Sequence, residues 1–149
     1  VNKNNDTTYI VAELSSAITA NTGSFYLVTG ADLGFLAYSS MGRGSAAAGP
    51  SLATGITSPG GIDTAVLTVT HDIAGDLSTI RRNGVAGTNG TGDKGAGNFG
   101  NYPLYIGARG GSSVYFNGRI YQLVIVGKTA SGTEISNTES FINGKTGAY

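Results

Sequence analysis

The chain has 149 residues, of which 40% are hydrophobic and 12% charged, and its nine basic and nine acidic side chains cancel to a net charge of zero. This length fits one domain, and the lack of excess positive charge argues against nucleic-acid binding, which depends on neutralising phosphates. The 25 glycines argue against a helical bundle, and the absence of cysteine excludes disulfides and thiolate sites. No apolar run approaches the roughly 20 residues that span a bilayer, so no membrane insertion is expected.

The first 39 residues are expected to hold three strands. Residues 1–7 are polar and are interpreted as a linker remnant of a longer polypeptide, since the chain begins at Val1 without a methionine; a single domain would then span residues 8–149. Strands are predicted at residues 9–14, 24–29 and 33–39, the last two forming a hairpin. Their apolar residues occupy both faces, so we expect contacts with other subunits to cover the outer one.

The middle of the chain alternates one regular hairpin with two irregular segments. Residues 41–62 hold six glycines and two prolines and are predicted to be a long surface excursion. Residues 65–73 alternate strictly and are followed by the turn 74–76 and a partner strand at 77–83. Residues 86–101 hold six more glycines and predict a second long loop.

The last third of the chain predicts two strands and a helix. A strand is expected at residues 102–107, and residues 114–126 form the most apolar stretch, whose second half we expect to be covered on both faces. Ser131 and Glu134 match a capping box, and a helix ending at Gly144 is a candidate for the cover. Seven or eight short strands and one late helix predict an all-β fold, an antiparallel β-sandwich with a short C-terminal helix.

Two motifs extend this prediction to a family. LYIG at residues 104–107 and FxGxIYQLxI at 116–125, followed by the capped segment SGTEI, resemble laminin-G-like, concanavalin A-type lectin jelly rolls. The hairpin beginning VLTVTHD and ending in Asn83-Gly84 resembles the central hairpin of that family. The resemblance covers roughly residues 65–140 and implies a jelly roll. The calcium-binding carboxylates of the family find no match here, so no metal or other cofactor is expected.

The closing stretch SNTESFINGKTGAY resembles the ends of bacteriophage tail-fibre and other virion proteins, where such domains form receptor-binding tips. This resemblance implies a homotrimer at the tip of a virion tail fibre, outside the cell. It also implies bacterial surface polysaccharide or lipopolysaccharide as the partner. The function expected is therefore non-catalytic receptor binding; a structural domain that trimerises or caps the fibre is the alternative, and a polysaccharide depolymerase a third.

Catalysis is not expected, because glycosidases need two carboxylates facing one cleft. The only glutamates are Glu13, Glu134 and Glu139, and two of them fall on the predicted helix. A depolymerase would need aspartates converging from separate loops, with Asp32, Asp63 and Asp93 as candidates.

Several polar residues admit both a structural and a functional interpretation. His71 shares a face with Leu67 and Val69, which favours a hydrogen-bonded core histidine. Arg81 and Arg82 point to opposite faces and favour structural ion pairs, although an arginine in a groove could bind a sugar carboxylate. The aspartates and asparagines near residues 72–76 and 89–98 could offer oxygens to a cation, but turn formation is favoured.

Tyrosine is abundant, with eight residues against no tryptophan, and it suits glycan binding because its ring packs on a pyranose while its hydroxyl reaches ring substituents. Tyrosines at strand ends beside the long loops are the best candidates. Together with polar loop residues they form the predicted ligand-binding cluster: Tyr38, Arg43, Asp93, Asn98, Tyr102, Arg109 and Tyr115.

Overall fold

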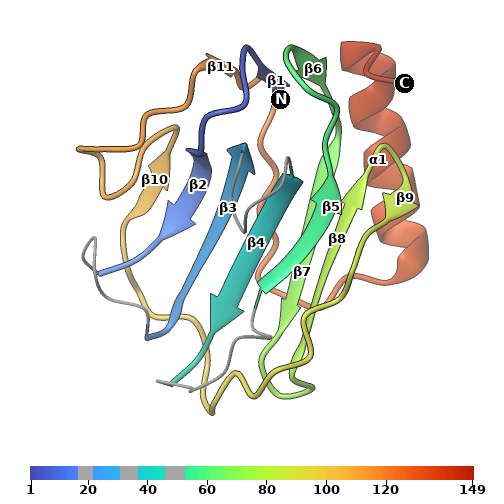
Figure 1. The fold of residues 1–149 in the computed structure, drawn as a ribbon. Helices are drawn as coiled ribbons and strands as arrows, with labels where there is room; N and C mark the ends of the chain where they lie inside the picture. The colour runs from blue at the N-terminus through green and yellow to red at the C-terminus, as the bar shows by residue number, and fades with distance from the viewer. Residues whose placement is uncertain (17–21, 31–36, 46–52) are drawn as a thin grey trace.

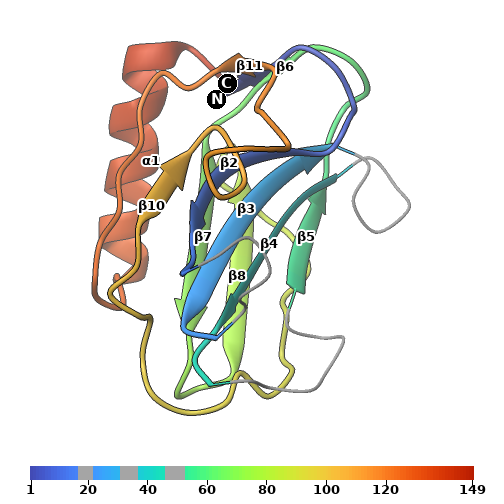
Figure 2. The same cartoon turned by 90° about the vertical axis from the view of Figure 1, so that its left-hand side faces the viewer.

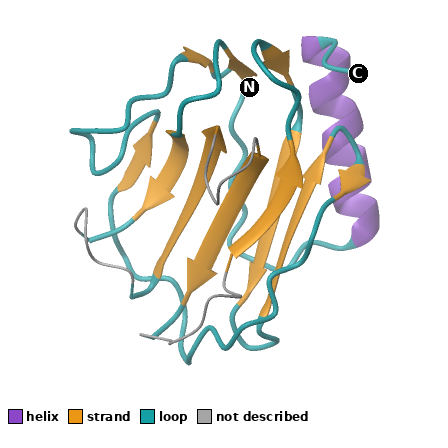
Figure 3. Cartoon of the chain, in the orientation of Figure 1, coloured by secondary structure: helices purple, strands orange, loops and turns teal. Residues whose placement is uncertain are grey.

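The computed structural model describes residues 1–16, 22–30, 37–45 and 53–149, and strands dominate this part of the chain (Figure 3). A five-stranded antiparallel sheet has the order β10-β2-β3-β4-β5, and a three-stranded one the order β7-β8-β9 (Figure 1). The first comprises β2 (Tyr9–Leu14), β3 (Ser24–Gly30), β4 (Ala37–Arg43), β5 (Ala53–Thr57) and β10 (Leu104–Ile106). The second comprises β7 (Leu67–Asp72), β8 (Leu77–Arg82) and β9 (Val85–Ala86).

A third, smaller sheet joins three two-residue strands in the order β11-β1-β6. These are β1 (Asn2–Lys3), β6 (Asp63–Thr64) and β11 (Gly118–Arg119), and the chain ends with helix α1 (Gly132–Thr146).

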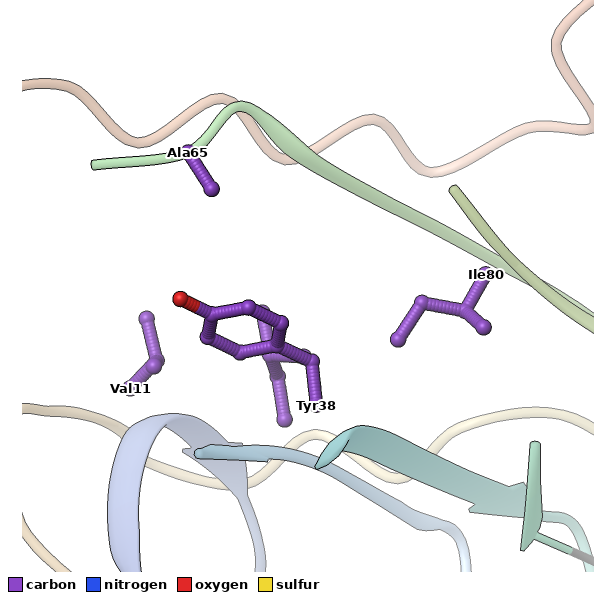
Figure 4. Packing of buried hydrophobic residues seen from close by; sticks show 5 residues of the cluster. Val11, Tyr38, Ala65 and Ile80 are labelled. Carbon is purple, nitrogen blue, oxygen red and sulfur yellow. The ribbon is translucent and has the colours of Figure 1, made fainter. Parts of the chain in front are cut away.

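The two larger sheets pack face to face over one core. Val11, Leu27 and Tyr38 of the five-stranded sheet meet Ile80 of β8, and Ala65 completes the buried cluster (Figure 4). This arrangement confirms the predicted antiparallel β-sandwich with a C-terminal helix; the jelly-roll topology stays a prediction.

The outer face of the five-stranded sheet is buried where β2 and β3 are most apolar. Because successive strand residues point to opposite faces, Val28 points away from the core that holds Leu27, and its partner Ile10 shares that direction. Both side chains are nonetheless buried within this single chain. Their burial therefore needs no second subunit, and the two-faced pattern is no argument for one; the homotrimer stays a prediction.

Residues 1–7 do not form a linker, which corrects the sequence prediction. β1 pairs with both β6 and β11, although these strands lie far from it in sequence. Lys3 is completely buried, and its Nζ donates to Asp6 Oδ1 and to the carbonyls of Pro59 and Gly61. A polar sequence was misleading here because the partners of Lys3 are mostly distant backbone carbonyls.

The two predicted hairpins are confirmed, but the segments around them need correction. β3 pairs with β4 and β7 with β8, and Asn83 at the end of β8 has a φ of 53°. The irregular segment predicted for residues 41–62 instead contains the end of β4 and all of β5. Of the strand predicted at 33–39, residues 33–36 lie outside the described residues and residues 37–39 belong to β4.

The apolar stretch at 114–126 is not the strand that was predicted. Only Gly118 and Arg119 enter a ladder. Phe116 and Ile120 pack on the core, but four large hydrophobic residues that follow them are exposed. The helix does not cover them, so the expectation of two covered faces was wrong. These exposed hydrophobic residues are Tyr121, Val124, Ile125 and Val126.

Helix α1 begins as the sequence predicts and ends three residues later. Ser131 and Glu134 form the capping box, whereas the C-cap is Gly147, with a φ of 59°, and not Gly144. The helix lies along the outside of the molecule in both views (Figure 1, Figure 2). Glu139 is its buried residue and pairs with Arg81, which points away from the core side of β8.

We expect Glu139→Ala to loosen helix α1, because this ion pair joins the helix to the outer face of β8. The Nε–Oε1 distance is 2.8 Å, and loss of the partly exposed pair should cost about 1–3 kcal/mol. Hydrogen exchange should accelerate over Gly132–Thr146 and stay unchanged in β7. Asn137→Ala, at an exposed position of the same helix, is the control. Unchanged exchange in both variants would contradict this role of Glu139.

Candidate functional site

One end of the sandwich brings together four of the seven predicted binding residues. The loop at 91–100 runs beneath the end of β4 (Figure 1) and bonds to it through backbone groups. Gly44 and Ser45 donate to the carbonyls of Lys94 and Ala96, each at 2.9 Å, and Gly100 donates to Gly23 at 2.8 Å. These bonds place four predicted residues at this end, called the loop end below: Arg43, Asp93, Asn98 and Tyr102.

The loop is fixed from inside by two side chains. Lys94 is completely buried; its Nζ donates to the carbonyls of Gly90 and Gly92, and its backbone N–H donates to Asp76. Burial lowers the pKa of Lys94, and the opposite effect of Asp76 offsets this shift only in part. Phe99 packs edge-on against Phe25, with ring centroids 5.5 Å apart. The exposed residues of the loop are therefore carried by a well-anchored backbone.

Each loop-end side chain offers different chemistry. Asp93 is exposed and accepts from the backbone N–H of Gly95 at 2.7 Å, and Asn98 is exposed. Tyr102 is half-buried against the backbone of Gly100, where an added Cβ would lie 2.3 Å from the ring. Arg43 is half-buried, and its Nη2 lies 3.4 Å from Met41 Sδ. The loop end thus combines hydrogen-bonding groups with one aromatic ring held in place by glycine.

The other three predicted residues lie elsewhere. Tyr38 is completely buried in the core, where its hydroxyl donates to Asp63, so its proposed contact with a ligand is wrong. Position near a strand end was a poor guide because Tyr38 points inward from β4. Arg109 and Tyr115 follow β10 at the edge of the five-stranded sheet, where Arg109 lies 3.5 Å from Glu13 and Tyr115 is exposed.

A row of residues on the outer face of the five-stranded sheet was missed by the sequence prediction. Tyr105, Glu13, Tyr26 and Met41 are successive ladder partners across β10, β2, β3 and β4. Cross-strand partners share a face, so their side chains lie side by side. Glu13 was considered only as a catalytic acid, and no local signal could have placed it beside Tyr105, since the two are distant in sequence.

The structural interpretations of His71 and the paired arginines are confirmed. His71 Nε2 lies 2.9 Å from Ser40 Oγ, and Nδ1 lies 2.8 Å from Ser78 Oγ, inside the sandwich. Arg81 pairs with Glu139 outside β8, and Arg82 pairs with Asp63 inside it.

The described carboxylates that were considered for a cation or for catalysis have hydrogen-bond or ion-pair partners within the chain. Asp72 accepts from the backbone N–H of Gly75, and Asp76 has a φ of 52° between β7 and β8, which confirms both as turn formers. Asp76 also accepts from the backbone N–H of Lys94. Asp63 is buried in its pair with Arg82, while Asp32 lies outside the described residues. Within the described ranges, three or more metal-ligating side chains do not gather at any point.

Comparison with known proteins adds no relative: no family model, curated protein or solved structure matches this chain. In the part of the chain that the structure describes, the one helix is too short and too polar to cross a bilayer.

Proposed function

We propose that this chain is a non-catalytic carbohydrate-binding module that recognises bacterial surface polysaccharide or lipopolysaccharide, as the receptor-binding tip of a phage tail fibre or related virion protein. The resemblance of its motifs to laminin-G-like jelly rolls and of its last residues to tail-fibre ends supports the assignment. Several copies on a homotrimeric fibre would raise weak single-site affinity through effective concentration.

The loop end is the observation that carries this proposal. Its exposed Asp93 and Asn98 can bind sugar hydroxyls, and Tyr102 supplies a ring for the apolar face of a pyranose. Because buried Lys94 and the backbone bonds to β4 already fix the loop, little conformational entropy remains to be lost on binding.

We expect Tyr102→Ala to weaken glycan binding about tenfold, the effect of losing one aromatic contact. The purified chain would be screened on an array of bacterial polysaccharides and lipopolysaccharides, and the best ligand titrated calorimetrically with each variant. Tyr121→Ala removes an exposed tyrosine outside the loop end and is the matched control. Binding to no glycan, or release of reducing ends from the bound one, would overturn the proposal.

A structural cap is the second candidate, favoured by the exposed apolar side chains that follow β11. Tyr121, Val124, Ile125 and Val126 are at least 47% exposed, and Phe141 on α1 is 57% exposed. Such residues suit contacts with neighbouring chains of a fibre. A capping domain would keep its function after Tyr102→Ala, so the same variant separates the two candidates.

A further inference from the structure

We infer that the glycan is acidic, and that Arg43 and Arg109 bind its carboxylate groups across the outer face of the five-stranded sheet. This inference rests on the proposed function and specifies its ligand class. Four buried side-chain atoms in the described part of the chain have no hydrogen-bond partner. Three belong to this face: Glu13 Oε2, Arg43 Nε and Arg109 Nε.

Arg43 has no anionic partner among the residues that the structure describes. It is the last residue of β4, and its partner Ser24 and its neighbour Met41 place it on the outer face. Within the described ranges, the hydrogen-bond partner of its Nη2 is a sulfur atom at 3.4 Å, which is a weak acceptor. A partly buried guanidinium without a counter-ion is unfavourable, so a carboxylate that binds it gains affinity.

Arg109 lies next to Glu13, and part of its side chain is exposed to solvent. Its Nε lies 3.5 Å from Glu13 Oε2, too far for a good hydrogen bond, while Ser15 donates to Oε1 of the same carboxylate at 2.6 Å. The side chain of Glu13 is 5% exposed and that of Arg109 is 37% exposed. Glu13 thus orients the guanidinium, and its two Nη groups form the planar fork that a carboxylate fits.

The row between the two arginines suits a sugar chain. Glu13 and Met41 flank Tyr26 on adjacent strands, with Arg109 beside Glu13 and Arg43 two residues beyond Met41 on the same face. Among the described residues of this face, two guanidinium groups stand against one carboxylate, which leaves an excess of positive charge. A neutral glycan would leave that charge unmatched, whereas a uronic acid polymer would neutralise it.

The other three arginines differ from Arg43 and Arg109, because each is either paired with a carboxylate or exposed to solvent. Arg81 and Arg82 each have a carboxylate partner, at 2.8 and 2.7 Å. Arg119 on β11 is exposed, so solvent screens its charge. Arg119 therefore provides a control with the same change in net charge at a position without a partly buried guanidinium.

The test is calorimetric titration with polygalacturonate, alginate and polysialate, and with the carboxyl-reduced form of each. We expect at least one acidic polymer to bind, and its reduced form to bind at least about tenfold more weakly. Arg43→Gln and Arg109→Gln should each weaken binding about tenfold, and Arg119→Gln should not. Thermal unfolding of each variant checks that it remains folded.

Equal binding of acidic and reduced polymers would overturn the inference, as would equal losses in Arg43→Gln and Arg119→Gln, which indicate nonspecific attraction. The inference also fails if none of the acidic polymers binds. If a neutral glycan then binds in a way that depends on Tyr102, the proposed function stands without this ligand class; if no glycan binds, both fail.

Discussion

Asp63→Asn is expected to lower the free energy of unfolding by about 3–5 kcal/mol, the cost of breaking a buried ion pair from one side. Asp63 is 7% exposed and accepts hydrogen bonds from the Tyr38 hydroxyl and from Arg82, whose Nη2 and Nε lie at 2.7 and 3.2 Å. Asparagine keeps the shape but removes the charge and turns one acceptor into a donor. Urea unfolding of both proteins at neutral pH measures the loss.

Tyr38→Phe is the matched control for this network. It removes one donor to Asp63 but keeps the ring in the core, so the expected cost is about 1 kcal/mol. Burial, followed by Asp63, raises the pKa of Tyr38, and Asp63 raises the pKa of Arg82, so both remain donors at neutral pH. If Asp63→Asn lowered the free energy of unfolding by less than about 1 kcal/mol, the charge of the carboxylate would not be needed to stabilise Arg82.

The sequence predicted elements whose signals are local. The hairpin of β7 and β8 follows from strict alternation, with Asp76 and Asn83 in the turn conformations that their residue types tolerate. The start of α1 follows from the Ser131–Glu134 capping box. Both depend on residues within a few positions of each other, so pattern and structure agree.

Contacts between distant segments were not predictable from such patterns. Whether Tyr38 faces a ligand or Asp63 depends on the packing of β4 against β6, and burial of Lys3 depends on the carbonyl of Pro59. The outer-face row was missed because Glu13 meets Tyr105 only through strand pairing. At the loop end, the residue types suggested four candidate binding residues, but their common location depends on backbone bonds to β4 that no local pattern predicts.

Stability is expected to fall by about 3 kcal/mol as the pH is lowered from 6.5 to 4, because His71 resists protonation in the fold. Burial, with a smaller effect of Lys94, lowers the pKa of His71 from 6.5 to about 4. The unfolded chain therefore takes up a proton first, and the stability present above pH 6.5 is lost as the pH falls through this window. Urea unfolding across the window measures the loss.

The hydrogen bonds around His71 explain why the neutral form fits. Ser40 donates its hydroxyl hydrogen to the Tyr26 carbonyl at 2.6 Å, so it accepts from Nε2–H of His71. Nδ1 must then accept from the completely buried Ser78. Protonation of Nδ1 would force the Ser78 hydroxyl to turn away. The ring cannot move aside either, because it lies over Gly42, where even a Cβ would be 2.5 Å away.

Two measurements separate His71 from other acid-labile groups. It is the only histidine, so its imidazole proton resonance should titrate with a pKa of about 4. His71→Gln should have lower stability at neutral pH but a nearly flat profile between pH 6.5 and 4.5, because Asp6 and Glu134, whose pKa values are lowered, titrate below this range. An imidazole pKa near 6.5 in the folded chain would contradict the argument, because folded and unfolded states would then bind protons equally.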